Sequence, residues 1–349
     1  MQVLVLCGGK SAEHEVSFLS AASVLDYLDP AKYRVSVIGI QKDGSLYPPE
    51  ATVDRLKLDS AEKFQFPWGE NWVCLLADLK PEIVFPVLHG PFGEDGTIQG
   101  MLEVLDIPYV GAGVWGSAVA MNKIHSKKIL LEEGLPVLPF ISIPQTEWQG
   151  CGEDFSKLVA DKLHYPVFVK PANLGSSIGI NKSASRDDLI QHIEAAFRYD
   201  DFILVEQGIE AREIETSVLG NSRPQVSIAG EIIPSREFYT YEAKYLDQGS
   251  QLLIPAPLSG EEMKRVQELS IATFQVLQLE GMARIDFLMD KKSGQFWVNE
   301  PNTIPGFTHI SMYPKLWQAS GLSYPDLLDK LIDLGLERYG RRSRFSVER

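Results

Sequence analysis

The sequence predicts an α/β protein whose first part holds a parallel sheet flanked by helices and whose last part is α+β. Over the first hundred residues, short β-rich runs alternate with helical patterns, as in QVLVLCGG, VSFLSAASVLDYL and RVSVIGI. Such alternation is typical of βαβ units. Near the C-terminus, two β-rich runs are joined by KKSG, which predicts an antiparallel hairpin. The length of 349 residues predicts two or three domains.

The composition is that of a globular protein and excludes several classes of function. Hydrophobic residues make up 44% of the chain, charged residues 23%, and the net charge is −14. Nucleic acids and anionic membranes require clustered Lys and Arg, so we expect neither partner. We also expect no signal peptide and no membrane span, because no basic flank and no stretch of about 18 apolar residues occurs. Cys7, Cys74 and Cys151 lack disulfide or zinc spacing, which favours a reducing, cytoplasmic setting.

The first strand ends in a glycine turn that faces either a ligand or only solvent. The stretch CGGKSAEHE lacks the G-x-G-x-x-G pattern, so a nicotinamide-dependent oxidoreductase is disfavoured. Glu15 precedes a helix that begins near Val16, and its ordinary interpretation is a helix cap. His89 opens HGPFGEDG after a further strand, and its ordinary interpretation is a hydrogen-bonded turn histidine.

A second region contains lysines and a glycine loop. Lys123 lies in the helical stretch MNKIHSKKIL, where the simplest interpretation of its lysines is a solvated basic face. Lys170 ends the β run YPVFVK and is followed by PANLGSSIG. Gly175 and Gly179 bracket two serines there, so the backbone N–H groups and hydroxyls of this loop could close over phosphate oxygens. The pattern is not a Walker motif, and the alternative is an ordinary hairpin between PVFVK and IGINKS.

Two carboxylates and an unusual loop follow. Glu206 ends the apolar run FILVE, where a strand end would present it to a cleft, and Glu213 closes the segment EQGIEARE. The polar, aromatic segment 236–251, REFYTYEAKYLDQGSQ, matches neither a strand nor a buried helix, which predicts a functional lid. Lys244 lies among its tyrosines and could bring a positive charge to a phosphate while the lid excludes water. The alternative is a disordered surface loop.

The predicted hairpin near the C-terminus carries polar side chains on one face. Because strand side chains alternate, Arg284 and Asp286 share a face, as do Glu300 and Asn302 on the partner strand. The opposite face takes the apolar residues Ile285, Phe287 and Trp297. Two carboxylates and an amide oxygen are the hard ligands that suit Mg²⁺ beside substrate phosphates. The alternative is a solvated strand face with an Arg–carboxylate pair.

These features belong to a longer series of motifs in a fixed order. The series reads GGxSxEHEVS, HGxxGEDG, NKxxSK, FVKP followed by GSSIG, VEQ, REIE, YEAKY, ARIDF and NEPNTIPGFT, and it runs from Leu6 to about Ile332. It resembles the D-alanine:D-alanine ligases of the ATP-grasp superfamily. A single motif could arise by chance, whereas the whole series in order is highly specific.

The resemblance implies an ATP-grasp fold with three domains and a defined reaction. An N-terminal Rossmann-like domain is expected at 1–112, a central domain at 113–206, and a C-terminal domain with the metal site and the lid at 207–349. ATP would bind between the last two and phosphorylate the carboxylate of a first D-alanine. The amine of a second D-alanine would attack the acylphosphate, giving D-alanyl-D-alanine, ADP and phosphate for peptidoglycan synthesis. The resemblance also implies two Mg²⁺ or Mn²⁺ ions and a homodimer.

An alternative within the same superfamily stays open. Another ATP-grasp carboxylate–amine ligase would join D-alanine to D-serine or D-lactate. The YEAKY lid resembles that of the dipeptide-forming members, which disfavours the D-lactate ligases.

The resemblance also assigns individual residues. ATP contacts fall on Lys123, Lys170, Ser177, Glu206, Gln207, Ile209, Glu213 and Lys244, and the metal ligands are Asp286, Glu300 and Asn302. The catalytic positions are Glu15, Ser176, Tyr245, Arg284 and Gly306. The substrate-binding positions are Glu15, His89, Arg284, Gly306, Ser311 and Met312.

Several of these positions have a stated role. Glu15 would lie near the ammonium of the first D-alanine and form a hydrogen-bonded triad with Ser176 and Tyr245. Arg284 would stabilise charge that develops on the transferred groups, which suits a planar cation.

Two positions depart from the family pattern. Gln207 stands where a lysine is often found, and Asn122 replaces the more usual aspartate before Lys123. Neither departure concerns the reacting groups directly.

Overall fold

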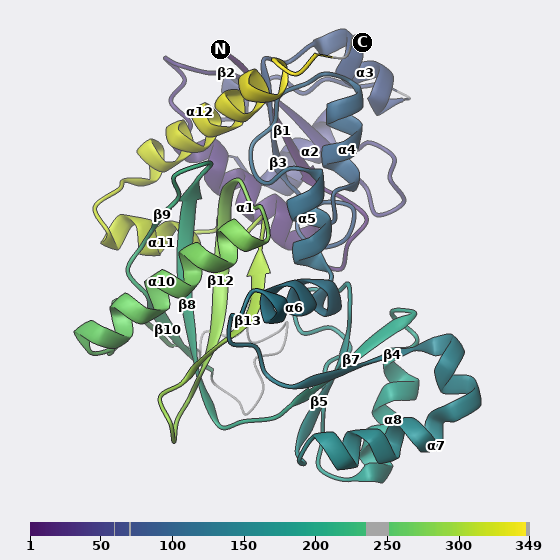
Figure 1. Ribbon diagram of the computed structural model, residues 1–349. Coiled ribbons are helices and arrows are strands. Elements are labelled where there is room, and N and C mark those ends of the chain that lie inside the picture. Colours follow the sequence, from purple (N-terminus) through teal and green to yellow (C-terminus); the bar gives the residue numbers. More distant parts are fainter. Residues whose placement is uncertain (59, 70, 235–250, 347–349) are drawn as a thin grey trace.

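The structure is a computed structural model that describes residues 1–58, 60–69, 71–234 and 251–346 (Figure 1). The predicted lid, 236–251, therefore lies outside the described residues except for Gln251 at its end. The described strands form three separate sheets, and helices cover them, so the predicted combination of α/β and α+β architecture is confirmed. None of the helices in the described ranges is long and apolar enough to cross a membrane.

The N-terminal sheet is parallel and has helices on both faces. Its strands β1 (Gln2–Gly8), β2 (Arg34–Ile40) and β3 (Ile83–Val87) lie in the order β2-β1-β3. Alternate residues of β1 point to opposite faces, so Val3 and Val5 enter one hydrophobic core and Leu4 and Leu6 another. The elements that accompany this sheet are α1 (His14–Tyr27), α2 (Pro49–Leu56), η1 (Ala61–Lys63), α3 (Trp72–Leu79) and α4 (Thr97–Val104).

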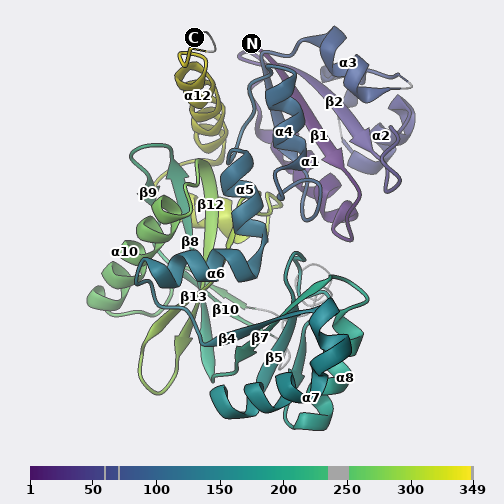
Figure 2. The same ribbon diagram turned by 45° about the vertical axis from the view of Figure 1, so that its right-hand side comes forward.

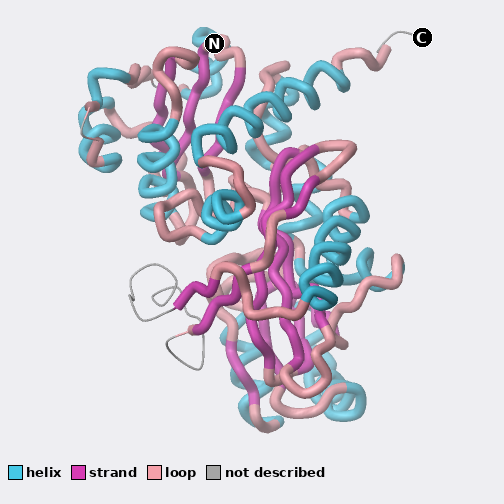
Figure 3. The backbone as a smooth tube through the Cα atoms, turned by 90° about the vertical axis from the view of Figure 1, so that its left-hand side faces the viewer, coloured by secondary structure: helices cyan, strands magenta, loops and turns pink. Residues whose placement is uncertain are grey.

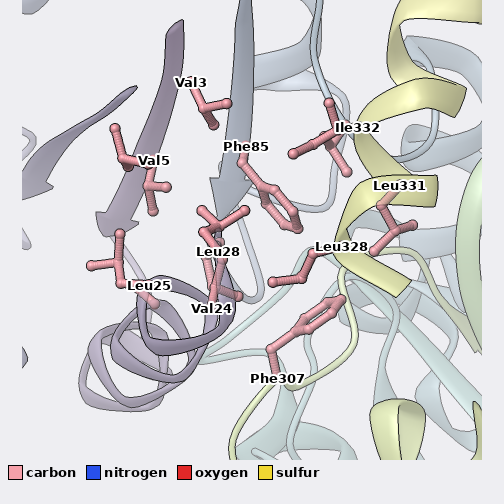
Figure 4. Close-up of a cluster of buried hydrophobic side chains, with 14 of the residues drawn as sticks. Val3, Val5, Val24, Leu25, Leu28, Phe85, Phe307, Leu328, Leu331 and Ile332 are labelled. Atoms are coloured by element: carbon pink, nitrogen blue, oxygen red, sulfur yellow. The ribbon is translucent and has the colours of Figure 1, made fainter. Parts of the chain in front are cut away.

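The C-terminal helix returns to this first sheet. Helix α12 (Tyr324–Arg342) places Leu328 and Ile332 against Phe85 of β3 and Val3 of β1 (Figure 4). Arg338, also buried, donates to the carbonyl oxygens of Tyr109 and Gly111. One hydrophobic core is therefore built from the beginning and the end of the described chain.

A small antiparallel sheet follows in the middle of the chain. Its strands β4 (Phe140–Pro144), β7 (Phe202–Gln207), β5 (Val167–Pro171) and β6 (Asn181–Ser183) lie in that order. Helices α7 (Gln145–Lys162) and α8 (Arg186–Ala196) cover one face (Figure 2), where Val169 and Val205 are buried. Lys170 and Glu206 alternate with these valines, so the opposite face presents them toward the rest of the molecule.

The largest sheet holds the predicted hairpin. Its path is β11 (Gln251–Leu253), β10 (Gly230–Ile233), β8 (Ala211–Gly220), β12 (Gly281–Asp290) and β13 (Phe296–Asn302), and β9 (Gln225–Val226) pairs with β8 (Figure 3). Helix α10 (Gly260–Val276) packs on it and begins with a capping box between Ser259 and Glu262. Helix α11 (Met312–Ala319) packs against β8.

Helices α5 (Val114–Met121) and α6 (Lys123–Glu132) pack with this large sheet, and Ile124 of α6 also contacts Leu204 of the small one. Val119 and Leu130 belong to the same hydrophobic core as Ile285 and Phe287. Within the predicted central domain, 113–206, the first two helices thus share a core with the C-terminal part. The domain boundaries themselves stay a prediction.

The predicted antiparallel hairpin is confirmed, and its register shifts once. Arg284 pairs with Asn302 and Asp286 with Glu300, but Phe287 pairs with Val298, so Asn299 is an extra residue in a β-bulge. Because of the bulge, the side chains of the β13 residues that precede Asn299 point to the faces opposite to those that a continuous alternation predicts. Trp297 was predicted to lie on the apolar face, and this prediction was wrong: Trp297 is half-buried opposite Leu288. The core positions there are Phe296 and Val298.

Candidate active site

The paired strands β12 and β13 bring Arg284, Asp286 and Asn302 into direct contact. Arg284 donates from Nε and Nη2 to the two oxygens of Asp286, each at 2.7 Å. The Asn302 amide nitrogen donates to the same carboxylate at 3.0 Å. Glu215 of β8, buried directly opposite Asp286, has its Oε2 3.1 Å from the Arg284 Nε. The four polar side chains predicted for this face therefore lie together, and Glu215 is a neighbour that the sequence did not single out.

Glu300, the fourth of these side chains, faces helix α6. Its Oε2 lies 3.0 Å from the Lys123 ammonium. Lys123 also donates to the carbonyl oxygen of Leu174, in the glycine loop, at 2.6 Å. Asn122 caps α6 by accepting from the backbone N–H of His125, a role that the more usual aspartate performs equally well. Lys123 thus joins the carboxylate face of the large sheet to the loop of the small one.

A second group of charged side chains is buried between helix α6, strands β5 and β7 of the small sheet, and strand β13 of the large one. The Glu206 carboxylate is paired through Oε1 with Lys127 and through Oε2 with Lys170, both at 2.6 Å. Lys170 also donates to the Oδ1 of Asn299, the bulge residue, at 3.3 Å. The prediction of a solvated basic face was wrong for Lys127, which is buried. It held only for Lys128, which is exposed.

The charges of this group stabilise one another. Burial alone would raise the pKa of Glu206, but the two lysines outweigh it and hold that pKa below its usual range. Burial opposes the charged form of Lys170 as well, yet pairing with Glu206 raises its pKa. Burial lowers the pKa of Lys127, against the opposing effect of Glu206.

A third contact links the N-terminal part to the glycine loop, and it corrects a prediction. The hydroxyl of Ser176 donates to the Glu13 carboxylate, and both residues are buried. Glu15 was predicted for this contact, but its side chain is 62% exposed and pairs with Arg55 at 3.1 Å. The reason is geometric: Glu13 precedes α1, whereas Glu15 lies in the first turn and projects from its outer side.

The glycine loop joins two paired strands. It connects β5 and β6, which form the hairpin that the sequence analysis gave as the alternative to a phosphate-binding loop. Ser176 and Ser177 both have positive φ, at 51° and 59°, so the loop turns tightly where it meets Glu13. A hollow of about 460 Å³ beside this contact is lined in part by Ser11, Glu13 and Gly175.

His89 is buried with partners on both ring nitrogens. Nδ1 lies 2.9 Å from the Ile304 carbonyl oxygen and Nε2 2.9 Å from the Ser20 hydroxyl. Since a carbonyl only accepts, Nδ1 carries the hydrogen and Nε2 accepts from Ser20. Burial lowers the pKa of His89, which favours this neutral form. His89 therefore fixes the backbone that precedes Gly306.

Glu94, which the sequence analysis did not single out, supports the same backbone. Its carboxyl group accepts from the N–H groups of Gly90 at 2.8 Å and Ile304 at 2.9 Å. Burial, reinforced by the nearby Glu13 carboxylate, raises the pKa of Glu94 to about 8. The loop after β3 and the segment after β13 are thus joined through Glu94 as well as His89.

The segment after β13 brings Gly306 against Ser311. A Cβ atom on Gly306 would lie 2.7 Å from the Ser311 hydroxyl oxygen, so a side chain would displace that serine. Ser311 accepts from the N–H of Thr308 at 3.0 Å. Met312 is buried in a cluster with Ile232 and Leu316, which leaves only its backbone to face a ligand.

The remaining predicted positions are placed less directly. The Gln207 side chain accepts from the backbone N–H of His164 and donates to the carbonyl oxygens of His164 and Gly208, so it is held by segments beside the small sheet. Ile209 and Glu213 are half-buried near the junction of the two sheets. Lys244 and Tyr245 lie outside the described residues.

The comparisons with known proteins agree with this geometry. A family model described as D-ala D-ala ligase N-terminus matches residues 2–112, and one described as D-ala D-ala ligase C-terminus matches residues 129–333. The D-alanine--D-alanine ligase of Thermoanaerobacter sp. (strain X514) is 49% identical over 360 residues, covering 98% of each chain. The chain belongs to the D-alanine:D-alanine ligase family. It is therefore a ligase of the ATP-grasp fold, as the motifs predicted.

Solved structures of ligases of this kind share the whole fold. The D-alanine-D-alanine ligase from Coxiella burnetii superposes with a TM-score of 0.83 at 35% identity, covering 99% of this chain and 96% of that one. The VanG D-Ala:D-Ser ligase from Enterococcus faecalis also gives 0.83, at 33% identity, covering 96% and 99%. The likeness extends to a ligase with a different acceptor, so the fold alone does not define the acceptor.

The donor set expected for divalent ions in this family is consistent with the geometry. Asp286 and Glu300 are neutralised by protein cations, Arg284 and Lys123, at the positions where ions would replace them. Asn302 turns its amide nitrogen to Asp286, so its Oδ1 is the atom that could accept a cation. No group of three or more His, Cys, Asp or Glu gathers within the described ranges.

Proposed function

We propose that this chain is an ATP-dependent ligase that joins two D-alanines into D-alanyl-D-alanine for peptidoglycan synthesis. ATP would phosphorylate the carboxylate of the first D-alanine. The amine of the second would then displace phosphate from the acyl carbon. The observation that carries the proposal is the convergence of Arg284 and Asp286 with Glu300 and Lys123 at the junction of the two sheets. This arrangement, in a chain of this family, is suited to a phosphoryl group transferred between nucleotide and carboxylate.

The nucleotide would lie between the small and the large sheet. Lys123 and Lys170 would supply positive charge for its phosphates. Lys123 already contacts Leu174 of the glycine loop, and Lys170 of the small sheet contacts Asn299 of the large one. In the structure the Glu206 carboxylate is held by Lys127 and Lys170, so its contact with the adenine end of ATP is proposed from the family alone. The remaining ATP contacts proposed from the family are Ser177, Gln207, Ile209, Glu213 and Lys244.

Two Mg²⁺ or Mn²⁺ ions would be held by Asp286, Glu300 and Asn302. When bound, the ions would neutralise charge on the phosphate oxygens. In this proposal Arg284 moves its guanidinium from Asp286 toward the transferred phosphoryl and acyl groups. Glu215, 3.1 Å from the Arg284 Nε, remains beside it and keeps it oriented.

The two D-alanines would occupy the side of the site nearer the N-terminal sheet. Glu13 lies beside the hollow near Gly175, so its carboxylate can bind the ammonium of the first D-alanine, with Ser176 as its latch. Gly306 exposes backbone that can receive the oxyanion, because no Cβ blocks approach. Ser311 and the backbone of Met312 would bind the carboxylate of the second D-alanine. Tyr245 is proposed from the family alone.

We also propose a cytoplasmic homodimer. The cytoplasmic location agrees with the three free cysteines, and the dimer rests on the family resemblance. Light scattering of the purified chain tests the dimer.

The test of the activity is phosphate release by the purified chain with ATP and Mg²⁺. We expect release with D-alanine alone and D-alanyl-D-alanine as the product by mass spectrometry. D-serine and D-lactate are added singly with D-alanine to detect mixed products. A dominant mixed product would replace the acceptor in this proposal, and no release with D-alanine under any of these conditions would overturn it.

A further inference from the structure

Two lysines of helix α6 are buried, and only one of them, Lys123, has a role in the proposed function. Lys123 and Lys127 are four residues apart, so they project from the same face of the helix. Lys123 reaches Glu300, whereas the Lys127 side chain is only 1% exposed and reaches Glu206. Lys128, the next residue, is exposed. A fully buried lysine is costly unless it is paired, so its position requires an explanation.

Lys127 shares its partner with Lys170. The two ammonium groups lie 2.6 Å from different oxygens of the Glu206 carboxylate. Lys127 is also held by the Val298 carbonyl oxygen of β13 at 3.3 Å. Lys170 is the more accessible of the two, with 10% of its side chain exposed. The carboxylate therefore has one fully enclosed cation, Lys127, and one that is partly exposed, Lys170.

This asymmetry matters when a phosphate enters the cleft. If Lys170 turns to the phosphate, Glu206 keeps Lys127 and stays compensated. Without Lys127, the same movement would leave a buried carboxylate with no counterion, which is strongly unfavourable. Lys170 would then remain bound to Glu206 and contribute less to the phosphate.

We propose that Lys127 is a positioning residue for nucleotide binding: it stays on Glu206 as the resident counterion and so releases Lys170 to the phosphates. The inference rests on the proposed function, in which Lys170 contacts ATP. It predicts that Lys127 acts on affinity for the phosphates and not for the nucleoside, which a purely structural lysine would not do.

The experiment compares the affinities of ADP and adenosine, each with Mg²⁺, by displacement of a fluorescent ATP analogue from the full chain. For Lys127→Met we expect ADP affinity to fall by roughly tenfold or more, and adenosine affinity to stay within about twofold. Lys128→Met is the matched control on the same helix and should bind both as the wild type does. An equal loss for ADP and adenosine in Lys127→Met, or no loss for ADP, would overturn the inference.

A second pair of variants serves if Lys127→Met does not fold. In Glu206→Gln the carboxylate is replaced by a neutral amide, so no counterion is needed. Adding Lys127→Met to Glu206→Gln should then leave ADP affinity within about twofold, and a further tenfold loss would contradict the role. A wild-type chain that binds neither ADP nor the ATP analogue would overturn the proposed function, and this inference with it. Failure of the Lys127 comparisons alone leaves the proposed function standing.

Discussion

The Ser176 hydroxyl donates to the Glu13 carboxylate, so the glycine loop of the small sheet is tied to the loop that precedes α1. A Cβ atom on the preceding Gly175 would lie 3.0 Å from Glu13 Oε2, which shows how closely the two loops approach. Glu13 can therefore act on the first substrate and on the position of the glycine loop at once.

The first prediction separates Glu13 from Glu15. Glu13→Gln should lower kcat/KM for D-alanine by roughly tenfold to hundredfold, because a lost hydrogen bond to a charged group costs about 1.5–3 kcal/mol. Glu15→Gln is the matched control and should stay within about twofold, since its exposed pair with Arg55 contributes little. Steady-state phosphate release at varied D-alanine concentration measures both. The reverse order of effects would restore the original assignment of Glu15.

The second prediction concerns Glu300. Glu300→Gln removes the negative charge that now faces Lys123 and weakens a proposed ion ligand, so phosphate release should fall by at least about a hundredfold. Mn²⁺ binding to the ADP complex, followed by electron paramagnetic resonance, should weaken as well. Glu268→Gln, on the exposed surface of α10, is the control. Full activity of Glu300→Gln would refute the metal role.

The third prediction concerns Gly306. Gly306→Ala would place a Cβ atom 2.7 Å from the Ser311 hydroxyl oxygen, so Ser311 must move. Because Ser311 is a proposed substrate-binding residue, its displacement should lower kcat/KM for D-alanine by roughly tenfold to hundredfold. Gly260→Ala has nothing within 4 Å of its added Cβ and should behave as wild type. Equal kinetics for the two variants would exclude a role for the Gly306 backbone.

The fourth prediction concerns the pH dependence of stability through Glu94. Its pKa is raised from 4.5 to about 8 in the folded protein, so between these values the folded state binds more protons than the unfolded state. Stability is therefore lost as pH rises through this window. Urea unfolding at several pH values should give a steeper decrease for the wild type than for Glu94→Gln. Parallel slopes would show that Glu94 titrates at its ordinary pKa.

The sequence predicted those features that depend on local periodicity. The period of two placed Arg284 and Asp286 on one face of their strand and Glu300 and Asn302 on one face of the other. The structure pairs Arg284 with Asn302 and Asp286 with Glu300. A bulge leaves no such periodic signal, so the insertion of Asn299 was missed and Trp297 was assigned to the wrong face. The bulge also aims Asn299 at Lys170.

Other residues escaped prediction because their environment comes from distant parts of the chain. Helical spacing places Lys127 beside Lys123 but cannot tell a solvated face from one covered by β7 and β13. Glu13 and Glu15 are two residues apart, and the boundary of α1 at His14 decides which one turns inward. That boundary is a detail that sequence patterns resolve only to within a few residues.

The return of α12 to the first sheet bears on how the chain is made. Leu328, Leu331 and Ile332 share a core with Val3 and Phe85, and α12 is the last of these elements to be synthesised. On the ribosome, the part of the N-terminal sheet that α12 covers therefore stays exposed until residues 324–342 have been translated, although α1 covers another part of the same face. The small middle sheet, whose core is contributed by residues 141–205, can form earlier.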